Sequence, residues 1–144
     1  MSSLFENWQF WAILAAIFAS LTAIFAKVGV ADIGSDFATF LRTLVVVAVL
    51  GLILWATGQY ERLDTISAKS ALFLVLSGLA TGASWVCYFR ALKLGQASQV
   101  APVDKLSVVL VAIFGAIFLG EQLSPAGWFG VSLVGAGAVI IAVS

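Results

Sequence analysis

Histidine is absent from this chain of 144 residues, and cysteine occurs once, at Cys87. Without histidine the chain cannot form a Ser/His catalytic pair, and a metal site of the usual Cys/His kind is not expected. One cysteine also excludes a disulfide framework within the chain. Cys87 lies in an apolar segment and is interpreted as a small packing residue. The sequence therefore predicts no enzyme, no metal site and no cofactor.

Charged residues are also scarce. Seven basic and seven acidic side chains cancel and make up 10% of the chain, whereas a soluble domain carries about 25%. No basic stripe is present, so nucleic acid is not an expected partner. Hydrophobic residues make up 62% of the sequence, and the mean hydropathy is +1.14. Too few polar side chains remain to cover a surface that faces water, so the expected surroundings are a lipid bilayer.

Five long apolar runs occupy most of the chain. A bilayer core of about 30 Å needs about 20 apolar residues per helix. Runs of this length predict helices at about residues 8–28, 37–57, 70–91, 98–119 and 125–143. They are apolar on every face rather than on one stripe, which is typical of helices in lipid. The predicted fold is an all-α integral membrane protein, a single domain over residues 1–144 that forms a bundle of five transmembrane helices.

Polar residues at the starts of these runs are expected to cap the helices, because their side chains can accept hydrogen bonds from the first free N–H groups. They are Asn7 before the first run, Ser35 and Asp36 before the second, and Ser98 before the fourth. Ser124 followed by Pro125 has the pattern of a cap and a first helical residue. Pro102 lies in the first turns of the fourth run, where its missing N–H is expected to cost little.

Small residues repeat at helical spacing in two of the runs. In lipid, such residues let helix backbones approach closely. They are Gly78 and Gly82, extended by Ser77, Thr81 and Ser84, in the third run, and Gly127, Gly130 and Gly135 in the last. These faces are expected either to pack within the bundle or to join two copies of the chain. The glycine-rich last run is the stronger candidate for a contact between subunits.

Ionisable residues inside the predicted helices need an explanation, because a charge at the centre of such a helix costs about 2.5–3.5 kcal/mol. Counting along helices that alternate in direction places five in the same half of the membrane: Lys27, Arg42, Arg90, Asp104 and Lys105. One interpretation is that they pair with one another or extend to the lipid headgroups, which suits Lys27 and Arg90 best. The other is a water-filled vestibule, which suits the deeper Arg42, Asp104 and Lys105.

The second interpretation gives a candidate cavity for a small-molecule substrate. Trp85 and Tyr88 share a helix with Arg90 and are candidates to line it, although aromatic residues near helix ends commonly serve as interface anchors. The complete set is Arg42, Trp85, Tyr88, Arg90, Asp104 and Lys105, with Ser77, Thr81 and Ser84 as weaker candidates. Cations outnumber the single anion among the five charged residues, so a ligand with a carboxylate or phosphate is favoured.

Three stretches resemble the EamA type of the drug/metabolite transporter superfamily. They are FLRTLVVVAVL at residues 40–50, LSGLATGASWVCYFRALKLGQASQVAPVDKLSVVLV at 76–111, and LGEQLSPAGWFGVSLVGAGAVII at 119–141. The last contains the glutamate after the fourth helix, Glu121, and the glycine-rich final helix that are typical of the family. The resemblance covers nearly all of the chain and implies a transporter fold.

In one respect the chain departs from that family. Most members contain two such repeats in inverted topology, whereas this chain is one repeat. The resemblance therefore implies a homodimer, with an inverted pair favoured, as in the small multidrug transporters of the same superfamily. Those proteins carry a membrane-embedded glutamate in their first helix, but no acid lies between Trp8 and Lys27, which puts their proton exchange in doubt here.

The expected function is transport of small metabolites or drug-like molecules across the cell (inner) membrane by alternating access. The alternative is a non-transporting membrane subunit or scaffold that binds another membrane protein. No long tail or docking motif supports that alternative.

Overall fold

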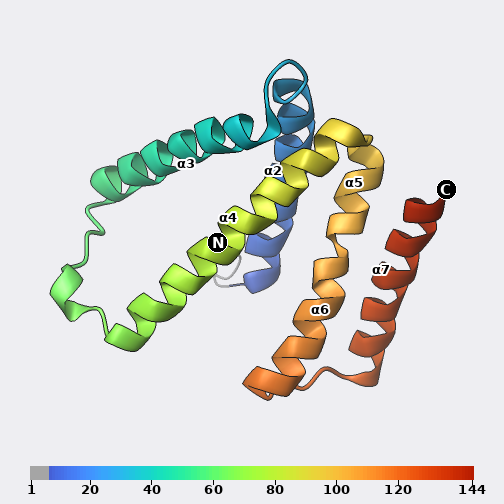
Figure 1. The fold of residues 1–144 in the computed structure, drawn as a ribbon. Coiled ribbons are helices and arrows are strands. Elements are labelled where there is room, and N and C mark those ends of the chain that lie inside the picture. The colour runs from blue at the N-terminus through green and yellow to red at the C-terminus, as the bar shows by residue number, and fades with distance from the viewer. Residues whose placement is uncertain (1–6) are drawn as a thin grey trace. The chain divides into compact units, whose positions relative to one another are not determined.

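A computed structural model of the chain describes residues 7–144, and within that range it contains helices and no strand. The helices are α2 (Trp8–Gly29), α3 (Ser35–Thr57), η1 (Leu63–Thr65), α4 (Ala68–Leu94), α5 (Ala97–Asp104), α6 (Leu106–Phe114), η2 (Gly115–Leu119) and α7 (Pro125–Val143) (Figure 1). The predicted all-α fold class is confirmed.

Five helical segments of the described chain are long and apolar enough to cross a membrane. Four are α2, α3, α4 and α7, and the remaining one combines α5, α6 and η2 over Ala97–Leu119. Most large hydrophobic side chains of these spans are not covered by protein. That surface suits helices surrounded by lipid, where the bilayer takes the place of a protein core.

Two of the expected helix caps are confirmed. The Asn7 Oδ1 atom accepts a hydrogen bond from the Gln9 N–H at 3.1 Å, at the start of α2. The Ser124 Oγ atom accepts one from the Gly127 N–H at 3.1 Å, and Pro125 is the first residue of α7. Both satisfy an N–H group that has no partner within its helix.

The caps expected in the second and fourth spans are wrong. Helix α3 begins at Ser35 after Gly34, and α5 begins at Ala97 after Gln96, and neither preceding residue forms a side-chain cap. The Asp36 carboxylate is turned toward another helix, where it pairs with Arg90. A charged hydrogen-bond partner is stronger than a neutral N–H, so the tertiary contact prevails over the local one.

The chain divides into two compact units. Among the described residues, one comprises 7–25 and 94–144, and the other comprises 26–93. In the first unit α7 packs against both α5 and α6. A Cβ atom built at Gly135 would lie 3.1 Å from Val109 Cγ2, so the missing side chain of Gly135 lets α7 approach α6 closely. Gly127 faces Leu123 and Ser124 beside its own helix start, and a Cβ at Gly130 would meet open space.

The fourth span ends in a π-helical turn, η2. The Glu121 N–H donates to the Gly115 carbonyl at 3.1 Å, and Gly120 adopts a left-handed conformation with φ of 68°. The Glu121 side chain folds back over this turn, since a Cβ built at Gly115 would lie 2.7 Å from Glu121 Oε2. A side chain at Gly115 would require the Glu121 carboxylate to move, and the left-handed φ of Gly120 favours glycine at that position.

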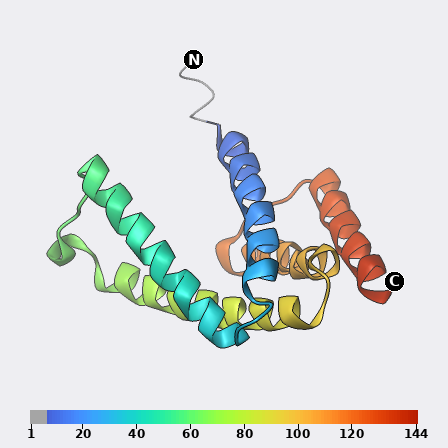
Figure 2. The same cartoon turned by 90° about the horizontal axis from the view of Figure 1, so that it is seen from above.

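In the second unit α3 and α4 form a hairpin. Its closed end is where the start of α3 meets the end of α4, and the two helices diverge from there. Figures 1 and 2 both show the start of α3 beside the last turns of α4, while the end of α3 and the start of α4 lie apart. The loop that joins the open ends holds η1 and an Arg62–Asp64 ion pair at 2.8 Å. The contacts that fix the hairpin are therefore concentrated at its closed end.

Replacing Gly135 by valine is expected to push α7 away from α6, because the added Cβ already lies 3.1 Å from Val109 Cγ2. Overpacking of this kind costs about 1–3 kcal/mol. Unfolding of the detergent-solubilised chain with increasing SDS measures the loss. Gly137→Val is the matched control, because a Cβ at that position has no neighbour within 4 Å. Equal losses in the two variants would contradict the contact.

Candidate functional site

Three helix ends meet in the unit of residues 26–93: the end of α2, the start of α3 and the end of α4. The covered side chains of this unit come from these ends and are Ala26, Val30, Ala38, Thr39, Phe89 and Leu92. Val30 and Leu92 are the most completely buried, at 1% and 0% exposure. The unit thus has a small apolar core beneath the polar groups at its closed end.

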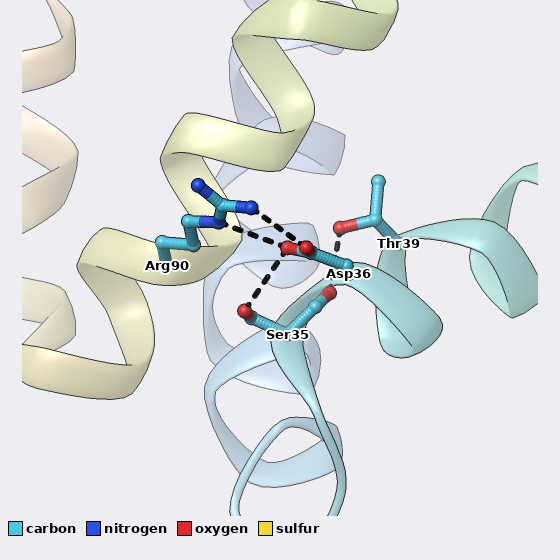
Figure 3. A network of polar contacts seen from close by, with 4 residues as sticks. All are labelled: Ser35, Asp36, Thr39 and Arg90. Atoms are coloured by element: carbon cyan, nitrogen blue, oxygen red, sulfur yellow. Dashed lines mark hydrogen bonds and ion pairs between the residues drawn. The ribbon is translucent and has the colours of Figure 1, made fainter.

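An ion pair links α3 to α4 across this end. Arg90 donates from Nε to Asp36 Oδ1 at 2.9 Å and from Nη2 to Asp36 Oδ2 at 2.7 Å (Figure 3). The Ser35 hydroxyl donates to Asp36 Oδ1 at 3.3 Å, and the Thr39 hydroxyl donates to the Ser35 carbonyl at 2.8 Å. A bidentate contact of this kind fixes orientation as well as distance. It therefore sets how the two helices meet.

Two lysines reach main-chain carbonyl groups at the same end. Lys27 Nζ, in the last turn of α2, donates to the Leu92 carbonyl at 2.6 Å. Lys93 Nζ, in the last turn of α4, donates to the Ile33 carbonyl at 2.5 Å. The last four carbonyls of a helix have no partner within it, and a lysine can satisfy one of them. We refer to Lys27, Asp36, Arg90 and Lys93 as the polar clamp.

Arg42 lies one layer deeper than the polar clamp. Its Cζ atom lies 4.0 Å from the ring centroid of Trp85 and 5.6 Å from that of Phe89. Tyr88, on the same stretch of α4, is close enough to interact with it electrostatically. The residue is half-buried and forms no hydrogen bond or ion pair with any residue that the structure describes. Its charge is therefore held against aromatic faces alone.

The aromatic contacts of Arg42 offset part of the cost of placing its charge within a membrane span. A cation on an aromatic face gains about 0.5–2 kcal/mol, while a charge within a membrane helix costs about 2.5–3.5 kcal/mol at its centre. Arg42 lies seven positions beyond Ser35, the first residue of α3, which is about 10 Å along the helix axis.

In the other unit the fourth span is interrupted at Asp104 and Lys105. Helix α5 ends at Asp104 and α6 begins at Leu106. The Lys105 N–H donates to the Pro102 carbonyl at 3.0 Å, a tighter turn than in an α-helix. Lys105 Nζ also lies 3.2 Å from Asp104 Oδ2. Pro102 lies inside α5, within its first turns as expected, and the regular helical bonding is interrupted shortly after it.

A comparison of the sequence with protein families gives a match to the EamA-like transporter family over residues 6–143. The chain belongs to the EamA-like transporter family. It is similar to a Sinorhizobium sp. protein described as "Uncharacterized transporter in cobO 3'region", with 60% identity over 138 residues that cover 96% of this chain and 98% of the relative. No solved structure matches the chain. The resemblance in the sequence is confirmed, and this protein is a multi-pass membrane transporter, not an enzyme.

The predicted cavity residues of this EamA-like transporter fall into three places. Arg42, Trp85 and Tyr88 lie together, Arg90 belongs to the polar clamp, and Asp104 and Lys105 pair with each other at the break in the fourth span. Of the predicted packing glycines, Gly78 and Gly82 face open space.

Sequence reasoning missed the partners of the clamp cations. The sequence pattern predicts a cap at Asp36. Its position at the start of the second helix, however, places it in the same half of the membrane as Arg90, and this shared depth is a sequence signal for the Asp36–Arg90 ion pair. Nothing in the residue types at positions 33 and 92 indicated that their carbonyl groups would accept hydrogen bonds from lysines.

Removing either charge of the Asp36–Arg90 pair is expected to destabilise the transporter, because the bidentate contact that orients α3 against α4 is lost. Asp36→Asn and Arg90→Gln should each lower the melting temperature of the detergent-solubilised chain, and the exchange Asp36→Arg with Arg90→Asp should recover part of it.

The loop pair Arg62–Asp64 provides the matched control for that experiment. It has the same bidentate arrangement, at 3.1 and 2.8 Å, but joins residues only two positions apart. Arg62→Gln and Asp64→Asn should leave the melting temperature unchanged. A drop as large as that of the clamp variants would show that charge loss in general, rather than the helix contact, lowers stability.

Proposed function

We propose that this EamA-like transporter moves small metabolites or drug-like molecules across the cell (inner) membrane by alternating access, as a dimer of oppositely oriented copies. The observation that carries the proposal is the number of spans. The described chain has five, and the relative that it covers to 98% is of the same single-repeat size. One repeat supplies one half of an inverted-repeat transporter, so a second copy has to supply the other half.

Topology supports the inverted arrangement of the two copies. An odd number of spans leaves the two ends of the described chain on opposite faces of the membrane. Two copies inserted in opposite directions reproduce the symmetry of transporters with inverted repeats, in which one half rocks against the other around a central site. Alternating access then follows from exchange between two equivalent arrangements of the pair.

A small-residue face of α4 is available for contact between the copies. Cβ atoms built at Gly78 and Gly82 would meet nothing within 4 Å, and Ser77, Thr81 and Ser84 on this helix are also exposed. The Thr81 hydroxyl is bonded to the Ser77 carbonyl at 2.9 Å, so its polarity is already satisfied. This face supports close helix approach in lipid, as does Gly130 in α7.

The substrate path is proposed from the depth of the ionised residues along their own spans. Arg42 lies seven positions beyond Ser35, and Asp104 lies seven positions beyond Ala97, which is about 10 Å in each case. Interrupted helices form the binding sites of many transporters, because their free backbone groups can contact substrate. Trp85 and Tyr88 line the path beside Arg42, Lys105 lies beside Asp104, and Arg90 holds the end of α4 in place.

The orientation of the chain tests the inverted pair. Reporter fusions to each terminus should find both termini on both faces of the membrane in comparable amounts. Arginines added to one terminus should force a single orientation and abolish transport, and coexpression with the oppositely biased variant should restore it. If the chain inserts in one fixed orientation and still transports, the inverted dimer is wrong.

The residues of the path are tested by flux into liposomes, with a panel of labelled amino acids, monocarboxylates, phosphate esters and quaternary amines. Arg42→Ala and Asp104→Ala should each lower the flux of the transported compound by about 10- to 100-fold, as expected for the loss of a charged hydrogen bond, while dimers persist. Arg62→Ala and Asp64→Ala, in the loop outside the spans, should transport normally. Normal flux in both path variants would reject this site.

A further inference from the structure

We infer that Arg42 binds the anionic group of the transported molecule, so that the substrate is an organic carboxylate or phosphate. The inference rests on the proposed transport function, because it names the substrate class of the path that contains Arg42. The cations in the membrane spans differ in whether their N–H donors have a hydrogen-bond or ion-pair partner.

Arg42 is the cation near the closed end of the hairpin whose donors stay unused. Arg90 is bonded to Asp36, and Lys27 and Lys93 donate to main-chain carbonyls. In the other unit Lys105 lies against Asp104. Within residues 7–144, by contrast, the Arg42 guanidinium has no hydrogen bond or ion pair and lies against the rings of Trp85 and Phe89. A guanidinium presents five N–H donors and no acceptor, so it fits an oxyanion and can bind it at two points.

The position of the guanidinium argues against a role as a lipid anchor. An arginine that snorkels extends toward the headgroups, which here means toward the level of Arg90 and Asp36. Trp85, on which the guanidinium rests, lies five positions before Arg90 in α4, about 7.5 Å deeper along the helix. The guanidinium therefore rests against the Trp85 ring and forms no contact with the Arg90–Asp36 pair.

The aromatic contact also makes the site preorganised. Trp85 and Phe89 are one helical turn apart on α4, and Phe89 is buried, so the surface that holds the guanidinium is fixed by packing. The polar clamp holds α3 and α4 together just above this layer. An anion that arrives from water finds an arginine that is already positioned and does not have to be ordered first.

Binding can be measured with Trp85 as an internal reporter. Trp8, Trp11, Trp55 and Trp128 are replaced by phenylalanine, which leaves Trp85 as the single indole of the full-length chain. The purified dimer in dodecyl maltoside, which contains no phosphate, is titrated with benzoate, methyl phosphate and benzamide. Benzamide has the size of benzoate but no charge. We expect saturable changes in Trp85 emission with both anions and binding about 10- to 100-fold weaker with benzamide.

Variants of Arg42 separate charge from geometry. Arg42→Gln should weaken anion binding about 10- to 100-fold, and Arg42→Lys should retain part of it, since lysine keeps the charge but not the two-point fork. Arg62→Gln removes an arginine from the loop and should bind like the unmodified chain. Equal responses to benzoate and benzamide, or unchanged binding in Arg42→Gln, would overturn the inference. If the reporter chain does not fold, anion-dependent rise of the melting temperature in the unmodified chain gives the same comparison.

Two further measurements identify the source of the anion and separate the inference from the proposed function. If Trp85 responds to added phosphatidylglycerol and to neither soluble anion, Arg42 is a lipid site and the inference fails. If liposome flux selects quaternary amines and is unaffected by Arg42→Gln, the proposed transport function is supported and the inference of an anionic substrate is wrong. If benzoate binds through Arg42 but no compound in the panel is transported, the anion site stands and the proposed function fails.

Discussion

The polar ends of helices in lipid impose the constraint on which the unit of residues 26–93 depends. Carbonyl groups in the last turn of a helix have no partner within it, so side chains or water have to supply one. Lys27 donates a hydrogen bond to the Leu92 carbonyl at the end of α4. Lys93 donates one to the Ile33 carbonyl in the turn before α3. The bidentate Arg90–Asp36 contact adds a fixed orientation. The aromatic layer that holds Arg42 follows from that arrangement.

The five spans were predictable from sequence because the rule behind them is local. A run of about 20 apolar residues crosses the bilayer whatever its neighbours are. Details that depend on competition between contacts were not predictable. Asp36 had the pattern of a cap but pairs with Arg90. Pro102 was correctly placed near the start of its span, yet the regular helix stops at Asp104. The pairing of Asp36 depends on an interaction that a single helix does not contain.

For the candidate site, the half of the membrane that holds each charged residue was predictable, but the partner of each residue was not. Alternating helix directions placed Arg42, Trp85 and Arg90 in one half of the membrane, but residue types alone did not separate the arginine that pairs from the one that rests on a ring. The glycines show a similar limit. Gly78 and Gly135 stand in comparable small-residue patterns, but only Gly135 has a side chain, that of Val109, against it. Spacing reveals a face and not what covers it.

Two of the three clamp contacts end on the peptide backbone, and this affects how the family can diverge. Every residue type carries a carbonyl oxygen, so positions 33 and 92 can change identity without losing the lysine hydrogen bonds, provided that the backbone keeps its path. Methods that infer proximity from correlated substitutions would detect the 36–90 pair at most. The remaining two contacts can persist through evolution while leaving no coupled signal in an alignment.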